Sequence, residues 1–264
     1  MDSLFEPEED PAYTLLNEDG AAPLLIACDH ASNQIPRSLE GLGIDPDLYE
    51  LHIAYDIGTR QVGMMLMEMF DAPLLLSNYS RLVVDLNRHH DDPTMITKVS
   101  DGHVIHGNLN LSETDRELRL STIFDPYHAK YSQLVDRLKQ KFVRPMILSV
   151  HSFTEHFQGF DRPWHFGVLW DKDKELAIDL LEKFHEIAVH NEPELVIGDN
   201  QPYNAKVPMG YSQIVQANDK NVEMALIEIR QDLVVDEKGQ SWAAEVLYDA
   251  VYPLLTNTTV SSKT

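Results

Sequence analysis

Short apolar runs alternate with amphipathic stretches along the chain. The runs have the length of buried strands and lie at residues 24–28, 74–76, 82–86, 146–150, 165–170, 195–200 and 224–232. Between them, apolar residues recur at three- and four-residue spacing, which predicts helices near residues 55–70, 112–120, 126–142, 172–189, 211–217 and 242–255. This alternation predicts an α/β fold, a single three-layer domain whose mostly parallel or mixed central sheet has helices on both faces.

The composition allows one substantial core in this domain. The 264 residues are 43% hydrophobic, which suits one α/β domain at residues 21–258. Residues 1–20 are acidic and polar, so they are expected to form an N-terminal surface arm. No apolar run reaches the roughly 18–20 residues of a membrane span, and the first residues lack the pattern of a signal peptide.

The net charge and the cysteine content limit the binding partners and the cell compartment that we expect for the protein. A net charge of −22 argues against nucleic acid or an anionic membrane, because both bind positive surfaces. The chain has one cysteine, Cys28, so neither an internal disulfide nor a cysteine-rich zinc site can form. The single cysteine suits a reducing environment, so we expect a cytoplasmic protein.

Several predicted strands end at residues that can bind metals or protons. His151 follows the run at 146–150, and Asp29, His30 and Asn33 follow the run at 24–28. Ligands bind at the carboxyl ends of strands in open α/β sheets, so these residues are candidates for a site. The alternative is that they only cap strands and turns through hydrogen bonds.

Charged residues accompany two further strands. Arg81 precedes the run at 82–86, and Asn87 and Arg88 follow it; arginines in this setting suit a carboxylate or phosphate ligand. Surface salt bridges would explain the same arginines. Glu228 and Arg230 interrupt the last apolar run, where a buried carboxylate needs a partner, a metal or a shifted pKa. An internal ion pair between these two residues is the alternative.

Together these residues describe a metal-assisted hydrolysis. Two histidines and one oxygen ligand can hold Zn²⁺ and leave a position open for water. Such a metal acidifies water and polarises a carbonyl, while a glutamate carries the proton to the leaving amine. Arginines would bind a carboxylate of the substrate. The set predicts hydrolysis of an amide bond next to a carboxylate.

Five segments resemble the N-formylglutamate amidohydrolase family in order and spacing. They lie at residues 29–36, 80–88, 151–154, 162–164 and 228–232, and the resemblance runs from about residue 24 to 250. It implies a zinc-carboxypeptidase-like α/β fold, related to aspartoacylase, and one Zn²⁺ per chain held in part by His30 and His151. It also implies Asn87 and Arg88 as carboxylate-binding residues and Glu228 as general base and acid.

At the position of the third metal ligand, the sequence differs from the pattern of carboxypeptidases. That pattern is His-x-x-Glu, whereas Asn33 stands at the glutamate position after His30. Asparagine is a weak, neutral ligand, so Asp56 or Asp29 would supply the oxygen, and we favour Asp56. The predicted metal ligands are therefore His30, His151 and Asp56.

Four functions fit these residues. We favour a metal-dependent amidohydrolase that cleaves an N-acyl, possibly N-formyl, amino acid, with Glu228 catalytic and four residues binding substrate: Arg81, Asn87, Arg88 and Arg230. A carboxypeptidase-like enzyme on a larger peptide and a non-catalytic carboxylate-binding module are alternatives on the same fold. A thiol hydrolase that uses Cys28 and His30 is the fourth, although a cysteine within an apolar strand is more often inert.

Overall fold

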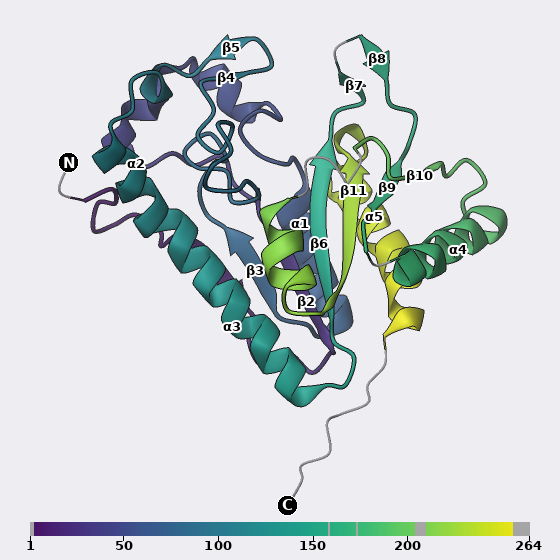
Figure 1. The fold of residues 1–264 in the computed structure, drawn as a ribbon. Coiled ribbons are helices and arrows are strands. Elements are labelled where there is room, and N and C mark those ends of the chain that lie inside the picture. Colours follow the sequence, from purple (N-terminus) through teal and green to yellow (C-terminus); the bar gives the residue numbers. More distant parts are fainter. Residues whose placement is uncertain (1–2, 158, 173, 204–209, 256–264) are drawn as a thin grey trace, which may run out of the picture.

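The computed structural model describes residues 3–157, 159–172, 174–203 and 210–255. A seven-stranded sheet lies at its centre, in the order β1-β3-β2-β6-β11-β9-β10 (Figure 1). Its strands are β1 (Tyr13–Leu16), β2 (Leu24–Cys28), β3 (Leu74–Ser77), β6 (Met146–Phe153), β9 (Phe166–Leu169), β10 (Ile197–Asp199) and β11 (Glu223–Arg230). Two small hairpins lie apart from it, formed by β4 (Val99–Ser100) with β5 (His103–Val104) and β7 (His156–Phe157) with β8 (Phe160–Asp161).

The sheet is mixed, as predicted. Four central strands, β3, β2, β6 and β11, run parallel to one another. At one edge β1 pairs antiparallel with β3, and at the other β9 pairs antiparallel with β11 and parallel with β10. The carboxyl ends of the four parallel strands therefore meet at one edge of the sheet, where open α/β sheets place their ligands.

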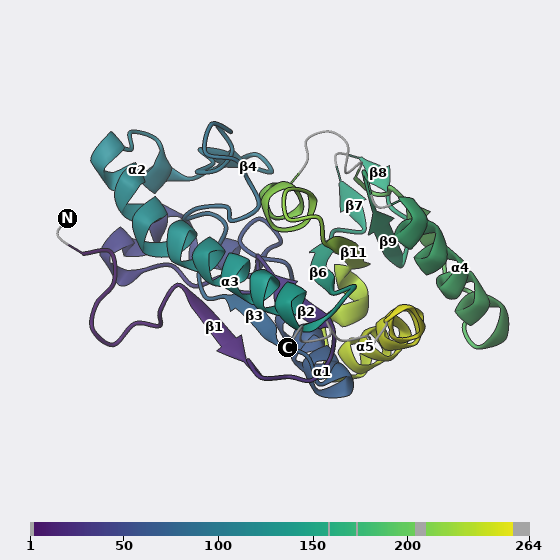
Figure 2. The ribbon, with the colours of Figure 1, turned by 60° about the horizontal axis from the view of Figure 1, so that its bottom comes forward.

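Helices cover both faces of the sheet. The α-helices are α1 (Thr59–Phe70), α2 (Glu113–Arg119), α3 (Asp125–Lys141), α4 (Lys174–His190) and α5 (Glu237–Val251). Figure 2 shows α3 on one side of the sheet and α1 with α5 on the other. None of the described helices is long and apolar enough to cross a membrane.

The two-residue period of the strands explains these layers. In β2, Leu24, Ile26 and Cys28 pack in the cluster that contains α1, α4 and α5, whereas Leu25 and Ala27 pack in the cluster that contains α3. Both faces of the strand are buried, which is why its sequence is continuously apolar. The prediction of a three-layer α/β fold is confirmed.

Residues 82–86 were expected to form a strand, and this prediction is wrong. The segment forms turns instead, in which the amide of Val83 donates to the carbonyl of Ser80 and that of Asp85 to the carbonyl of Met95. Its apolar side chains are buried all the same, beneath the connection that follows. Burial, and not strand pairing, accounts for the apolar run.

The N-terminal segment also differs from the expected surface arm. Residues 13–16 form the edge strand β1, and the side chain of Leu4 is buried in the core beside α3. At the other end, residues 256–258 of the predicted domain lie outside the described residues.

Candidate metal centre and active site

Three strand ends bring the principal candidate residues together. His30 follows β2 by two residues, His151 lies near the carboxyl end of β6, and Glu228 lies near that of β11. Glu228 pairs in register with His151 across the two parallel strands, and β2 pairs with β6 on its other side. The three residues therefore lie on adjacent strands at the same edge of the sheet.

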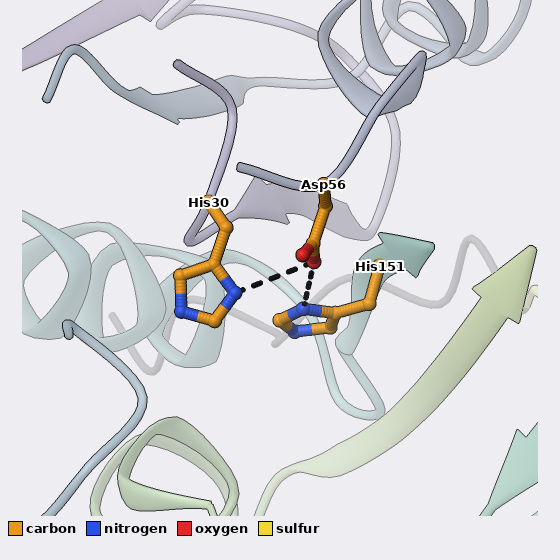
Figure 3. A group of neighbouring side chains, drawn as sticks. All are labelled: His30, Asp56 and His151. Carbon is orange, nitrogen blue, oxygen red and sulfur yellow. Dashed lines mark hydrogen bonds and ion pairs between the residues drawn. The ribbon is translucent and has the colours of Figure 1, made fainter. Parts of the chain in front are cut away.

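Asp56 joins the two histidines. The backbone amide of Asp56 donates to the carbonyl of His30 at 2.9 Å, which fixes this loop against the end of β2. The Oδ2 atom of Asp56 lies 3.3 Å from Nδ1 of His30 and 2.8 Å from Nδ1 of His151 (Figure 3). All three side chains are buried, and each offers a ligand atom within 4.8 Å of the others.

The other two candidate oxygen ligands point elsewhere. Asp29 accepts hydrogen bonds from the hydroxyls of Tyr127 and Ser212, at 2.6 and 2.7 Å. Asn33 donates from its amide group to the carbonyl of Tyr49 at 3.0 Å. Of the three candidate oxygen ligands, only Asp56 belongs to the cluster of possible metal ligands among the described residues.

A second group of side chains fixes the orientation of the histidines. The Nε2 atom of His30 lies 2.8 Å from Oδ1 of Asp85, and Nε2 of His151 lies 3.2 Å from the hydroxyl of Ser149. Arg81 donates to Oδ2 of Asp85 from Nε at 3.1 Å and from Nη2 at 2.7 Å. Ligand histidines commonly use their second ring nitrogen in this way, bound to a carboxylate or hydroxyl partner.

Sequence reasoning gave Asp85 no role, although a signal for it existed. Asp85 is the one charged residue in the run Leu82–Leu86, and a carboxylate in an apolar run needs a partner if it is buried. Because residues 82–86 were expected to form a strand, nothing in the sequence placed the side chain of Asp85 near His30. In the structure the turn at this position directs the carboxylate toward the end of β2.

The buried charges stabilise one another. Burial alone would raise the pKa of Asp56, but positive charge on His30 and hydrogen bonds from His151 and His30 hold it well below its usual range. Burial opposes the charged form of His151 as well, but the hydrogen bond to Asp56 and its negative charge raise the pKa of His151 to about 9. His52, which has no such hydrogen bond, has a pKa lowered to about 4 by burial.

The donor set fits a zinc ion. Nitrogen and oxygen ligands at about 2.0–2.2 Å from a tetrahedral Zn²⁺ lie roughly 3.4 Å from one another. The distances from Asp56 Oδ2 to the two Nδ1 atoms, 3.3 and 2.8 Å, are close to this separation. The Nε2 atom of each imidazole already has a hydrogen-bond partner. The Nδ1 atoms of both histidines therefore face Oδ2 of Asp56. His30, Asp56 and His151 could therefore hold a metal.

Glu228 is a buried carboxylate with a raised pKa. Its side chain is buried, and its Oε2 atom has no hydrogen-bond partner among the described residues. Burial raises its pKa to about 7 against the opposing charge of His151. The predicted alternative of an ion pair with Arg230 is not formed, because Arg230 donates to Asp232 at 2.7 and 3.1 Å.

Comparison with known proteins identifies the family. The family model of N-formylglutamate amidohydrolase matches residues 22–235, which is most of the chain and includes every residue of the candidate centre. The chain belongs to the N-formylglutamate amidohydrolase family. The resemblance inferred from the five sequence segments is confirmed.

The chain is also similar to individual proteins and solved structures. A gene product of Agrobacterium tumefaciens of known structure is 29% identical and has a TM-score of 0.87, covering 95% of this chain and 99% of its own. N-formylglutamate amidohydrolase from Ralstonia eutropha, at 19% identity and a TM-score of 0.68, shares the fold over 93% of this chain and 97% of its own. N-formylglutamate deformylase from Pseudomonas putida is 29% identical over 154 residues, 52% of this chain and 54% of that protein. The match thus spans about half the length of the curated relatives.

Of the three arginines predicted to bind substrate in this family member, two already have carboxylate partners. Arg81 pairs with Asp85 and, at 3.4 Å, with Asp56, and Arg230 pairs with Asp232. Arg88 has no carboxylate within ion-pair distance among the described residues. Its neighbour Asn87 accepts a hydrogen bond from the amide of Ser212 at 3.2 Å. Direct substrate contact by these residues stays a prediction.

The cysteine of this N-formylglutamate amidohydrolase family member is unsuited to nucleophilic catalysis. Cys28 is completely buried, and its thiol donates to the carbonyl of Thr59 at 3.6 Å. Burial and the nearby charge of Asp29 raise its pKa far above the usual range, so the thiolate does not form near neutral pH.

Replacing Asp85 with asparagine is expected to weaken Zn²⁺ binding about 10–100-fold, the usual effect of losing a carboxylate that orients a ligand histidine. Asparagine keeps the shape of the side chain but accepts the proton of His30 Nε2 more weakly. Competition with a chromophoric chelator measures the affinity. Asp136→Asn, which removes an exposed carboxylate paired with Lys220, is the control and should bind zinc like the wild type. An unchanged affinity for Zn²⁺ in Asp85→Asn would contradict the expectation that Asp85 orients His30 for metal binding.

Proposed function

We propose that this chain is a metal-dependent amidohydrolase that cleaves an N-acyl amino acid, most specifically an N-formyl amino acid, into a carboxylic acid and the free amino acid. Membership of the N-formylglutamate amidohydrolase family supports the reaction class. The observation that carries the mechanism is the position of the buried carboxylate of Glu228, in register with His151 beside a possible metal site, with no hydrogen-bond partner for Oε2 among the described residues.

His30, Asp56 and His151 would hold the metal, for which we propose Zn²⁺, one per chain. A zinc ion bound by these residues would polarise the carbonyl of the scissile amide and lower the pKa of a water molecule. Asp85 and Ser149 keep the imidazoles in position through their second nitrogens. Because these partners are in place before the metal binds, little reorganisation is required of the side chains.

Glu228 would act as general base and then as general acid. Its carboxylate takes a proton from the attacking water as the oxygen bonds to the acyl carbon, and it delivers that proton to the amide nitrogen as the carbon–nitrogen bond breaks. A pKa near 7 suits both directions of transfer near neutral pH, and burial raises the pKa of Glu228 to about 7.

Asn87 and Arg88 would bind the carboxylate on the carbon next to the scissile nitrogen. Arg88 has no carboxylate partner among the described residues, so its guanidinium group can accept one from the substrate. Arg81 and Arg230 are already paired with aspartates, and we propose that they supply positive potential near the substrate without a direct contact. The substrate is then a small, negatively charged N-acyl amino acid.

Removing the metal is expected to abolish hydrolysis of N-formyl-L-glutamate, and adding Zn²⁺ back should restore it. The rate is measured as release of free glutamate by the wild-type protein before and after dialysis against a chelator, with metal content followed by elemental mass spectrometry. Full activity in protein shown to be free of metal would contradict the proposal. Stoichiometric binding of the ligand without turnover by the zinc-loaded protein would favour the carboxylate-binding module instead.

A further inference from the structure

Asp29 is a buried carboxylate held by two hydroxyl groups. It directly follows β2 and precedes the candidate metal ligand His30, and only 1% of the residue is exposed. Tyr127 donates to its Oδ1 atom at 2.6 Å, and Ser212 donates to its Oδ2 atom at 2.7 Å. A carboxylate in the protein interior is unfavourable unless such hydrogen bonds are well made, so the position of both hydroxyl groups is strongly constrained.

The contact with Asp29 fixes Ser212 at the start of a helical turn. Ser212 is itself buried and directly precedes the short helix η5 (Gln213–Asn218). Backbone amides at the start of a helix have no acceptor within the helix, so they are available to other partners. The amide of Ser212 donates to Oδ1 of Asn87 at 3.2 Å, and the amide of Tyr211 donates to the backbone carbonyl of Asn87 at 3.4 Å. Ser212 thus connects Asp29 to Asn87.

The contact with Ser212 determines which way the side-chain amide of Asn87 faces. A backbone amide only donates, so the atom that it meets on Asn87 is the side-chain oxygen. The NH₂ group of Asn87 is then the other arm of the side chain, and it donates no hydrogen bond within the part of the chain that the structure describes. This donor arm is therefore available to an anionic ligand such as a carboxylate.

Gly210 leaves the space that Asn87 occupies. A β-carbon at Gly210 would lie 2.4 Å from Oδ1, 2.8 Å from Nδ2 and 2.9 Å from Cγ of Asn87, far inside contact distance. Any other residue at this position would displace the side chain of Asn87. Close approach of a backbone to its neighbour is a common reason for glycine. Residues 210–212 therefore pack directly against Asn87.

A separate contact fixes the backbone of Asn87 to the candidate metal centre. The amide of Asn87 donates to Oδ1 of Asp85 at 2.9 Å, and the same oxygen lies 2.8 Å from Nε2 of His30. Asn87 is thus connected to the end of β2 twice, by its backbone through Asp85 and by its side chain through Ser212 and Asp29. The two connections together set the distance between the metal site and a carboxylate bound at Asn87.

We propose that Asp29 and Ser212 are positioning residues for substrate binding. The carboxylate of Asp29 holds the hydroxyl of Ser212, and the amide of Ser212 holds Asn87 with its donor arm free for the substrate carboxylate. Both residues would act through Asn87, without touching the substrate. A donor that is held in place beforehand loses less conformational freedom on binding, which raises affinity. This inference rests on the proposed amidohydrolase function and deepens it by assigning the residues that orient one of its substrate contacts.

The test compares the loss of each hydroxyl group that Asp29 binds. In zinc-loaded Ser212→Ala, KM for N-formyl-L-glutamate should rise about tenfold, the usual effect of one lost hydrogen bond, while kcat and metal content stay within about twofold. Tyr127→Phe is the matched control, because it removes the other donor of Asp29 and should change KM by less than about twofold. A rise of KM of the same size in both variants would overturn the inference in favour of a structural role for Asp29.

A double-mutant cycle tests whether the effect passes through Asn87. Asn87→Ala should itself raise KM, and adding Ser212→Ala to it should raise KM by less than about twofold more, because the contact is already lost. A further rise as large as that in the wild-type background would overturn the inference. Gly210→Ala displaces Asn87 by an independent route and should raise KM with kcat unchanged. An unchanged KM in both Gly210→Ala and Ser212→Ala would likewise overturn it.

A failure of the proposed hydrolysis gives a different result. If the zinc-loaded wild type does not cleave N-formyl-L-glutamate, the amidohydrolase function fails, and calorimetric binding of the same compound then tests the positioning residues alone. Binding about tenfold weaker in Ser212→Ala than in both the wild type and Tyr127→Phe would support the inference. Equal binding by the three proteins, or no binding by the wild type, would overturn it.

Discussion

Replacing Glu228 with glutamine is expected to lower kcat by about a thousandfold and to leave the bound metal in place. Glutamine has the shape of glutamate but cannot take a proton from water, and positioned general bases contribute about 10²–10⁴-fold to rates. Glu228 is not among the three possible metal ligands of the described residues, so the metal content should not change. Steady-state kinetics with N-formyl-L-glutamate, together with elemental mass spectrometry, measure both quantities.

Glu223→Gln is the matched control for this variant. Glu223 begins the same strand, β11, but lies at its opposite end, where it pairs with Arg144 near the surface. Its replacement should change kcat by less than about twofold. If Glu228→Gln kept more than about a tenth of the wild-type kcat, proton transfer by Glu228 would be excluded, and another group would have to carry the proton.

Replacing His151 with alanine is expected to remove the bound metal and with it nearly all activity. The change leaves only His30 and Asp56 of the candidate ligands, and two ligands do not hold zinc against dilution during purification. Elemental mass spectrometry should find about one Zn²⁺ per wild-type chain and less than about a tenth of that in the variant. Activity should fall by about 10⁴-fold, because the metal supplies both carbonyl polarisation and acidified water.

His156→Ala provides the comparison for this variant. His156 is exposed in the β7–β8 hairpin and contacts Asp161 at 2.7 Å, so its loss should leave the metal content unchanged. Zinc retained at the wild-type level in His151→Ala would show that another set of ligands holds the metal. A partial fall in zinc content in both His151→Ala and His156→Ala would instead indicate that zinc binds at surface histidines.

The sequence predicted the layered fold because its strands are buried on both faces. Continuous apolar runs such as residues 24–28 and 146–150 are typical of interior strands, and the helices between them have clear periodicity. The polar residues that follow these runs, His30 and His151, were therefore expected at one edge of the sheet, and they lie there. The family resemblance, carried by segments spread along the chain, is confirmed by the family model, which matches residues 22–235.

Other parts of the site depend on loops, for which the sequence carries no periodic signal. The run at 82–86 has the composition of a strand, yet its backbone turns, and this turn gives Asp85 its contact with His30. The sequence also left open an ion pair between Glu228 and Arg230, but Arg230 donates to Asp232 instead, and Oε2 of Glu228 has no hydrogen-bond partner among the described residues. Which charged side chains pair with one another depends on the folded chain and cannot be read from their spacing in the sequence.

The order of the strands also constrains how the protein folds. The central strand β6 lies between β2, from the first part of the chain, and β11, from the last. Such non-local pairings close long loops and are formed slowly, on millisecond to second timescales in all-β domains of high contact order. His30, His151 and Glu228 cannot meet until these pairings exist. Zinc uptake would thus follow assembly of the sheet and not nucleate it, so in a variant that keeps all three candidate ligands the metal content reports whether the sheet has assembled.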